Sequence, residues 1–292
     1  MKGLLSLNDI STDKIREIID LALEFKHGKH FTYHSEKKIA TLFFENSTRT
    51  HYSFMIACMN LGIIPVDFNS DTSSVLKGES LYDTVKTFEC LGVDGVVIRH
   101  TKDGYYKDLE NINIPIFNAG DGQSDHPTQT LLDLITVYED FGHFEGLKIT
   151  FIGDVKHSRV AHGNALAMTR LGMEARICGP QFFMDNTAKV IDIEEAVQTS
   201  DVLNLLRVQF ERNAELNMTV NEYHQKYGMT KKRVDEMKEG AIIIHPAPIN
   251  RGVEIADEVA ECKQSRILTQ ETNGVYARMA VINMVLEGKL WF

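Results

Sequence analysis

The chain has 292 residues, of which 43% are hydrophobic, and its formal net charge is -10. This length and apolar content suit two domains of ordinary size or one large one. The acidic excess argues against nucleic acid as the default partner, because a polyphosphate surface usually needs a broad excess of Lys and Arg, so an anionic ligand requires a local pocket.

Short apolar runs, often β-branched, alternate with helical patterns along nearly the whole chain. The runs predict strands, and their alternation with helices predicts two parallel-sheet α/β domains. The predicted strands comprise residues 39–44, 63–68, 95–99, 114–118, 148–153, 174–178, 202–207 and 241–245.

Two predicted helices carry most of the information on organisation. One begins at Ser47, presents a core-facing apolar stripe and stops at Gly62. The other begins at Pro127 and ends near Gly142, where a polar turn precedes a new strand. This second helix is long enough to join two domains, so we place the domain boundary within or just after it.

No apolar run approaches the roughly 20 residues that a membrane span needs, and residues 1–10 lack a signal-peptide pattern. We therefore expect a cytoplasmic protein without a membrane partner. The four cysteines are far apart and form no C-x-x-C pair, which disfavours a disulfide framework or a zinc site. We interpret them as buried thiols and expect no metal. They are Cys58, Cys90, Cys178 and Cys262.

The first candidate site is the segment in which the predicted strand of residues 39–44 runs into a helix. Hydroxyls and one guanidinium open that helix: Ser47, Thr48, Arg49 and Thr50. Free amides of a first helical turn and the helix dipole favour an anion there, and the planar fork of an Arg suits phosphate oxygens. For an isolated S-T-R-T segment, an ordinary helix cap with a solvated Arg is about as good an interpretation.

Other predicted strands also end in polar residues, where open parallel sheets bind ligands. Arg99 or Arg207 taken alone is better interpreted as a surface ion pair, but four arginines after strands of two sheets, Arg49, Arg99, Arg159 and Arg207, favour an anion site. The candidate site residues that follow these strands are Arg99, His126 and Gln129 in the first half of the chain, and Arg159, Arg207, Gln209, Ala247 and Pro248 in the second half.

Two of these assignments have a strong alternative. A His that precedes Pro at a helix start, as His126 does, can simply satisfy nearby backbone groups. The polar loop that contains Ser73 and Lys77 reads on composition alone as an ordinary exposed loop.

Taken together, the motifs of the chain resemble the catalytic chains of the aspartate branch of the aspartate/ornithine carbamoyltransferase family. The resemblance runs from about Leu5 to the carboxyl terminus. The motifs are F-E-N-S-T-R-T, S-S-V-L-K-G-E-S, V-I-R-H, N-A-G-D-G-x-x-x-H-P-T-Q, G-D-x-K-x-S-R-V, L-R-V-Q-x-E-R, H-P-A-P-x-N-R-G-x-E-I and N-G-V-x-x-R-M-A. S-T-R-T and H-P-T-Q mark the whole family, and L-R-V-Q and H-P-x-P point to the aspartate branch.

The resemblance implies a carbamoyl phosphate-binding domain at residues 1–140, on which residues 273–292 pack back, and an aspartate-binding domain at residues 141–272. It places the last helix, which returns to the first domain, at about residues 273–286. It implies transfer of the carbamoyl group of carbamoyl phosphate to the α-amine of L-aspartate, giving N-carbamoyl-L-aspartate and phosphate in an early step of pyrimidine biosynthesis. No cofactor is implied. The implied partners are the neighbouring subunits of a homotrimer with shared active sites. Whether a separate regulatory chain also binds is left open.

The resemblance also implies roles for individual residues. Arg49, Thr50, Lys77, Arg99 and His126 would be catalytic. Carbamoyl phosphate would be bound by Ser47, Thr48, Arg49, Thr50, Arg99, His126, Gln129, by Ser73 of a neighbouring subunit, and by the backbone at Ala247 and Pro248. Aspartate would be bound by Lys77 of the neighbour and by Arg159, Arg207 and Gln209. Asn46 departs from the family pattern, which often has Pro there, and we expect it to alter turn rigidity more than chemistry.

Three other functions are weaker alternatives. An ornithine carbamoyltransferase shares the phosphate half, but Arg159 and Arg207 would repel its cationic substrate, and that branch typically has H-C-L-P where this chain has H-P-A-P. A nucleotide-dependent oxidoreductase lacks support because no G-x-G-x-x-G or G-x-x-x-x-G-K-[ST] follows a strand. A phosphate-binding module without catalytic activity is a third alternative.

Overall fold

The computed structural model describes residues 3–70, 73–210 and 218–290. The chain forms two compact units, of which unit 1 contains residues 1–135 and 271–292 and unit 2 contains residues 136–270. Both transitions between the units fall inside helices, namely α4 (Pro127–Phe141) and α9 (Ile267–Leu286). The boundaries expected from sequence, after residues 140 and 272, lie a few residues further along each of these helices.

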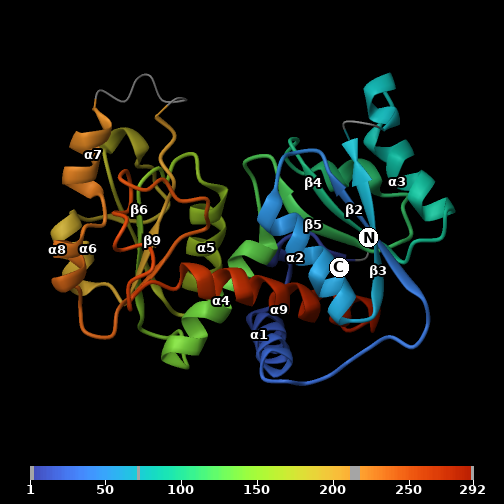
Figure 1. Cartoon of the computed structure of the whole chain (residues 1–292), viewed down its shortest axis with the longest axis horizontal. Coiled ribbons are helices and arrows are strands. Elements are labelled where there is room, and N and C mark those ends of the chain that lie inside the picture. The colour runs from blue at the N-terminus through green and yellow to red at the C-terminus, as the bar shows by residue number, and fades with distance from the viewer. Residues whose placement is uncertain (1–2, 71–72, 211–217, 291–292) are drawn as a thin grey trace. The chain divides into compact units, whose positions relative to one another are not determined.

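Unit 1 is built on a five-stranded parallel sheet with the order β1, β5, β4, β2, β3 (Figure 1). Its elements before α4 are β1 (Gly3–Leu4), η1 (Leu7–Asp9), α1 (Thr12–Lys26), β2 (Lys37–Phe43), α2 (Thr48–Asn60), β3 (Ile63–Asn69), η3 (Ser74–Lys77), α3 (Leu81–Cys90), β4 (Gly95–His100), η4 (Tyr105–Leu109) and β5 (Ile116–Asp121).

The alternation of side chains along β2 places helices on both faces of this sheet. Ala40 and Leu42 pack in one apolar cluster with Val85 of α3. On the opposite face, the hydroxyl of Thr41 lies 3.2 Å from Nε2 of His51 on α2. Because β2 has hydrogen-bonded neighbours on both sides, it is an inner strand, and its carboxyl end lies between those of β4 and β3.

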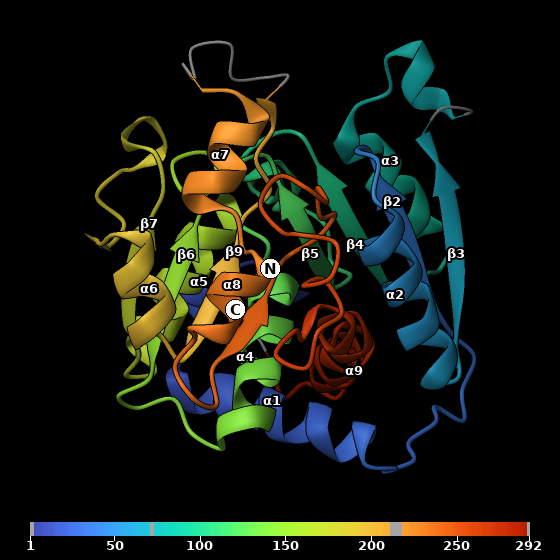
Figure 2. The same cartoon turned by 60° about the vertical axis from the view of Figure 1, so that its left-hand side comes forward.

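The carboxyl-terminal part of α9 belongs to unit 1, where it lies beside α1 and α2 (Figure 2). The Lys26 ammonium of α1 donates to Oδ1 of Asn273 over 2.8 Å, and the Asn60 side chain of α2 contacts the sulfur of Met279. The prediction of two parallel α/β domains with the last helix returning to the first is therefore confirmed.

Unit 2 is built on a second five-stranded parallel sheet, in the order β10, β9, β6, β7, β8. Helices α6 and α8 share an apolar cluster on one face, and α5 lies on the other face (Figure 1). Its elements between α4 and α9 are β6 (Lys148–Ile152), α5 (Arg159–Arg170), β7 (Glu174–Cys178), η5 (Gln181–Phe183), β8 (Lys189–Val190), α6 (Ile193–Thr199), β9 (Val202–Leu205), α7 (Val220–Tyr227), α8 (Lys231–Asp235) and β10 (Ile242–Ile244).

All eight predicted strands are present, with shifts at their ends. The strands β1 and β8 were not predicted, because two residues are too few to show a period. The last helix was predicted at residues 273–286 but begins at Ile267, since the polar segment L-T-Q-E-T in its first turns hides the helical pattern.

The expectation of four buried thiols is only partly right. All four cysteines are free, and Cys58 and Cys178 are buried. Burial raises the pKa of each of these two thiols to about 12. Cys90, the last residue of α3, is exposed, and Cys262 is partly buried. None of the helices in the described part of the chain is long and apolar enough to cross a membrane.

Candidate functional site

The turn after β2 leads directly into the first turn of α2, as the sequence predicts. Ser47 occupies the position before the helix with extended backbone angles, but its hydroxyl makes no capping hydrogen bond to the described residues of α2. An ordinary Ser cap would use that hydroxyl on an amide of the helix. The Ser47 hydroxyl is therefore not used as an ordinary helix cap, and the anion site expected at this helix start stays a prediction.

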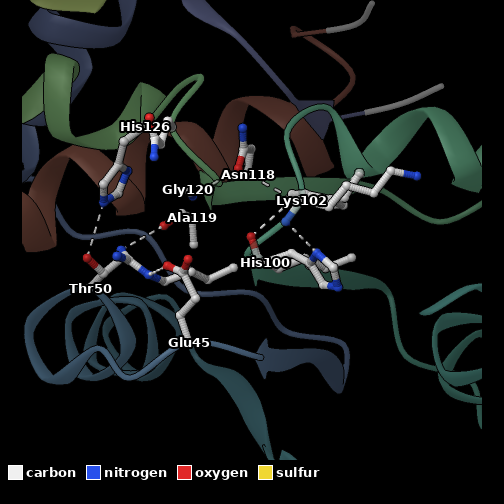
Figure 3. A network of polar contacts seen from close by, with 12 residues as sticks. Glu45, Thr50, His100, Lys102, Asn118, Ala119, Gly120 and His126 are labelled. Atoms are coloured by element: carbon white, nitrogen blue, oxygen red, sulfur yellow. Dashed lines mark hydrogen bonds and ion pairs between the residues drawn. The ribbon is translucent and has the colours of Figure 1, made fainter. Parts of the chain in front are cut away.

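Thr50 and His126 meet in the interior of unit 1. Oγ1 of Thr50 lies 3.3 Å from Nε2 of His126, and both side chains are buried (Figure 3). His126 immediately precedes α4, and its carbonyl accepts from the amide of Gln129. The Gln129 side chain donates to Oδ1 of Asp133 over 3.0 Å, which fixes its amide within the first turns of the helix.

Arg99 joins the ends of three strands. Its Nε lies 3.0 Å from Oε2 of Glu45, which follows β2, and its Nη1 donates to the carbonyl of Ala119 on β5 over 3.3 Å. Figure 3 shows Glu45, Ala119, Thr50 and His126 in the same close view. The prediction that residues after neighbouring parallel strands come together therefore holds for Thr50, Arg99 and His126, which we call the unit 1 cluster together with Arg49.

Arg49 points to α9, a contact that sequence reasoning missed. Its Nε lies 2.7 Å from Oε1 of Glu271, and the pKa of Glu271 is raised by burial against the opposing effect of Arg49 and Arg278. Arg278 is buried over the ring of Phe54 and donates to the carbonyl of Gly274 over 2.8 Å. Burial and, to a lesser extent, Arg99 lower the pKa of Arg278 to about 10, while Glu271 opposes the shift.

Glu45, Glu271 and Arg278 are thus part of the same electrostatic group as the predicted Arg49 and Arg99. Of these three residues, only Arg278 could have been expected from the sequence to have a buried ionic partner. Arg278 is the single charged residue in the apolar run of residues 277–285, and a charge in such a run needs a partner. Glu271 gives no such signal, because nothing local shows that it will meet a residue more than 200 positions away.

The loop with Ser73 and Lys77 is separate from the unit 1 cluster within one chain. The Ser73 hydroxyl accepts from the amide of Val75 and donates to the carbonyl of Ser70 over 3.0 Å, so it caps η3. Lys77 is exposed at the end of η3. Within residues 3–70, 73–210 and 218–290, neither side chain makes a hydrogen bond or an ion pair with the unit 1 cluster. The structure of one chain does not bring them together with it.

In unit 2, Arg207 is oriented by a residue of the loop after β10. Its Nε donates to Oδ1 of Asn250 over 3.3 Å, and the Asn250 amide donates to the carbonyl of Val208 over 2.9 Å. The same loop holds Ala247, whose φ of 48° is unusual for a residue with a side chain, and a cis bond to Pro248. The predicted aspartate-site Arg and the predicted backbone contacts are therefore linked through Asn250.

Arg159 is the first residue of α5, behind a Ser158 cap that accepts from the amide of Ala161 over 3.1 Å. It follows β6, which pairs in parallel with β9, the strand before Arg207 and Gln209. Both arginines therefore follow the same edge of the unit 2 sheet. The E and R of the motif L-R-V-Q-x-E-R, at positions 211 and 212, lie outside the described residues.

These geometries agree with the similarity of the chain to known proteins. The model of the aspartate/ornithine carbamoyltransferase carbamoyl-P binding domain matches residues 2–139, and that of the Asp/Orn binding domain matches residues 145–285. The chain belongs to the aspartate/ornithine carbamoyltransferase family. The family prediction is thus confirmed, and with it the prediction that the chain is a carbamoyltransferase enzyme.

Relatives of this carbamoyltransferase match it over nearly its whole length. The aspartate carbamoyltransferase catalytic subunit of Staphylococcus epidermidis is 48% identical over 98% of this chain and 100% of the relative, and that of Listeria welshimeri is 46% identical over 99% and 97%. Among solved structures, the catalytic subunit of M. Jannaschii aspartate transcarbamoylase superposes with a TM-score of 0.87 at 31% identity, over 99% of each chain. The Trypanosoma cruzi aspartate transcarbamoylase in complex with carbamoyl phosphate and aspartate superposes with a TM-score of 0.84 at 28% identity, over 96% of this chain and 95% of that one.

Proposed function

We propose that the chain is an aspartate carbamoyltransferase, which transfers the carbamoyl group of carbamoyl phosphate to the α-amine of L-aspartate and releases N-carbamoyl-L-aspartate and phosphate. The observation that carries this proposal is the unit 1 cluster, in which Thr50, Arg99 and His126 converge beside the first turn of α2. The full-length relatives named aspartate carbamoyltransferase support aspartate over ornithine as the acceptor.

Carbamoyl phosphate binds in unit 1 in this proposal. The phosphate accepts hydrogen bonds from the hydroxyls of Ser47, Thr48 and Thr50, from the first amides of α2 and from Arg49, with Ser73 of a neighbouring subunit completing the set. The carbonyl oxygen accepts from Thr50, Arg99 and His126. Gln129 and the backbone carbonyls at Ala247 and Pro248 receive the carbamoyl NH₂.

Aspartate binds through its two carboxylates. Arg159, Arg207, Gln209 and Lys77 of a neighbouring subunit are the proposed partners, and the link from Arg207 to Asn250 supports a fixed direction for that guanidinium. The cationic side chain of ornithine would meet Arg159 and Arg207 without a compensating anion, which supports a preference for an acidic acceptor.

The reaction is an attack of the uncharged α-amine on the carbonyl carbon, followed by collapse of the tetrahedral intermediate with loss of phosphate. The negative charge that develops on the carbonyl oxygen is stabilised by donors already held in place, so catalysis needs little reorganisation. The contact of Arg99 with the Ala119 carbonyl and the contact of Thr50 with His126 support such a preorganised arrangement. The departing phosphate can accept the proton lost by the amine.

A carbamoylation assay with aspartate and ornithine in parallel tests this function. We expect carbamoyl aspartate from the purified chain and no carbamoylation of ornithine. Arg99→Ala should reduce kcat by about 100-fold or more, because it removes a donor to the developing oxyanion. Arg170→Ala, at the far end of α5, is a matched control that should keep full activity. Turnover of ornithine alone, or equal activity of the two variants, would contradict the proposal.

The assembly, location and pathway belong to the same proposal. A homotrimer explains why the Ser73 and Lys77 loop stands apart from the unit 1 cluster within one chain. The word subunit in the names of the relatives supports an assembly of several chains. Mass measurement of the native protein distinguishes a homotrimer from a larger complex with a regulatory chain. We assign the enzyme to the cytoplasm and to an early step of pyrimidine biosynthesis.

A further inference from the structure

A carboxylate is built into the proposed phosphate site. Oε1 of Glu271 lies 2.7 Å from Nε of Arg49, and the two side chains are 38% and 48% exposed, respectively. Both groups are therefore accessible to a small anion from solvent. Glu271 comes from α9, so its position relative to α2 is set by helix packing rather than by a flexible loop.

The contact has an unfavourable consequence for an anionic ligand. A guanidinium has five N–H donors, and Glu271 occupies the Nε side of Arg49, which leaves the two terminal nitrogens for phosphate oxygens. A phosphate on Arg49 then lies within a few ångströms of a carboxylate. At that range like charges repel appreciably even near a protein surface, and a doubly charged phosphate is repelled more than a singly charged one.

The position of Glu271 is nevertheless useful to the fold. Arg278 is only 2% exposed, and Glu271 is the anion that favours its charged form. A buried guanidinium without an anion nearby is costly. Glu271 therefore stabilises the charge of buried Arg278 and also forms an ion pair with Arg49.

We propose that Glu271 determines how tightly the enzyme holds phosphate groups, by competing with them for Arg49 and by repelling their charge. The inference rests on the proposed function, because it takes Arg49 as a phosphate ligand. In an enzyme whose product is also phosphate, the same carboxylate weakens product inhibition. Glu271 is thus an affinity-determining residue rather than a catalytic one.

Glu271→Gln separates charge from geometry, since the amide oxygen still accepts from Arg49 while the negative charge is lost. With the full chain and sulfate or inorganic phosphate as the probe in titration calorimetry, we expect the variant to bind each anion at least about fivefold more tightly. Glu17→Gln removes an exposed carboxylate from α1 of the same unit and should leave binding unchanged. Unchanged or weaker binding by Glu271→Gln overturns the inference.

The pH dependence of sulfate binding gives a second test, because sulfate keeps its double charge between pH 5 and 8. Burial raises the pKa of Glu271, so its charge is lost earlier on acidification than that of an ordinary Glu. The charged groups that face it are the guanidinium groups of Arg49 from α2 and Arg278 from α9. The ratio of wild-type to variant dissociation constants should fall toward one at the acidic end. A constant ratio overturns the inference.

Failure of this inference is distinguishable from failure of the proposed function. If aspartate is carbamoylated and Arg49→Ala weakens phosphate binding, while Glu271→Gln does not tighten it, only the role of Glu271 is wrong. If aspartate is not carbamoylated, the function itself is wrong. Should the loss of charge beside Arg278 unfold Glu271→Gln, Glu271→Asp withdraws the carboxylate by one methylene and should still tighten sulfate binding. No tightening in that folded variant overturns the inference as well.

Discussion

Glu254 holds His245 through a hydrogen bond of 3.2 Å between Oε1 and Nε2, and both side chains are almost completely buried. The same oxygen accepts from the backbone amide of Asn250. Nδ1 of His245 accepts from the amide of Ala247 over 2.8 Å, so the ring proton lies on Nε2, where it is donated to Glu254. One buried carboxylate therefore fixes the loop of Ala247 and, through Asn250, the direction of Arg207.

This relationship predicts a selective loss in Glu254→Ala. The variant leaves the Nε2 proton of His245 and the amide of Asn250 without an acceptor, which should cost about 1 to 3 kcal/mol of unfolding free energy. Because Asn250 then loses its position beside Arg207, KM for aspartate should rise more than KM for carbamoyl phosphate. Denaturant unfolding and steady-state kinetics measure the two effects. Glu261→Ala, at an exposed ion pair nearby, is the control, and equal changes in both KM values would contradict the assignment.

The contact between Thr50 and His126 predicts a loss in turnover. His126→Ala removes a donor to the carbonyl oxygen and the partner of the Thr50 hydroxyl, so kcat should fall by roughly 100-fold. His143, an exposed residue after α4, supplies the matched control His143→Ala, which should behave as the wild type. A variant His126→Ala with normal kcat would remove His126 from the proposed mechanism.

The separation of Lys77 from the unit 1 cluster predicts complementation between inactive variants. Arg99→Ala and Lys77→Ala should each be nearly inactive as pure proteins. When the two are dissociated, mixed and reassembled, some sites combine an intact Arg99 with an intact Lys77 from a neighbour, and activity should return. A mixture of Arg99→Ala with His126→Ala should stay inactive, because both residues belong to the unit 1 cluster of the same chain. Absence of recovery in the first mixture argues against shared sites.

Asp125 predicts a pH-dependent stability. Burial raises the pKa of this carboxyl, although it accepts from the amide of His126 over 2.7 Å. Below about pH 4 the Asp125 carboxyl is protonated in both the folded and the unfolded state, so its ionisation does not affect the free energy of unfolding. As the pH rises from there through the folded-state pKa, the unfolded state loses its proton first and stability falls. Asp125→Asn should lack this fall and be more stable at pH 7. Parallel pH profiles of unfolding free energy for the two proteins would contradict this.

The part of the site that follows strands was predictable, because the carboxyl ends of parallel strands share an edge. Thr50, Arg99 and His126 are in this class: Thr50 contacts His126 directly, and Arg99 contacts Glu45, which follows β2, and the Ala119 carbonyl of β5. Their individual roles toward substrates stay predictions. The contact of Arg49 with Glu271 was not predictable, since it depends on where a helix from the other end of the sequence packs. The strand β1 was missed for a related reason, because its two residues form a strand only when β5 is present to pair with them.

The discontinuity of unit 1 has a consequence for the order of folding during synthesis. The segment that completes its core, residues 271–286 of α9, leaves the ribosome only after every residue of unit 2 has been made. Domains generally fold as they emerge, so unit 2 can finish while the earlier-made unit 1 still waits for its last helix. Until the whole second unit has been translated, nascent unit 1 therefore exposes the surface of α1 and α2 that α9 covers in the finished fold.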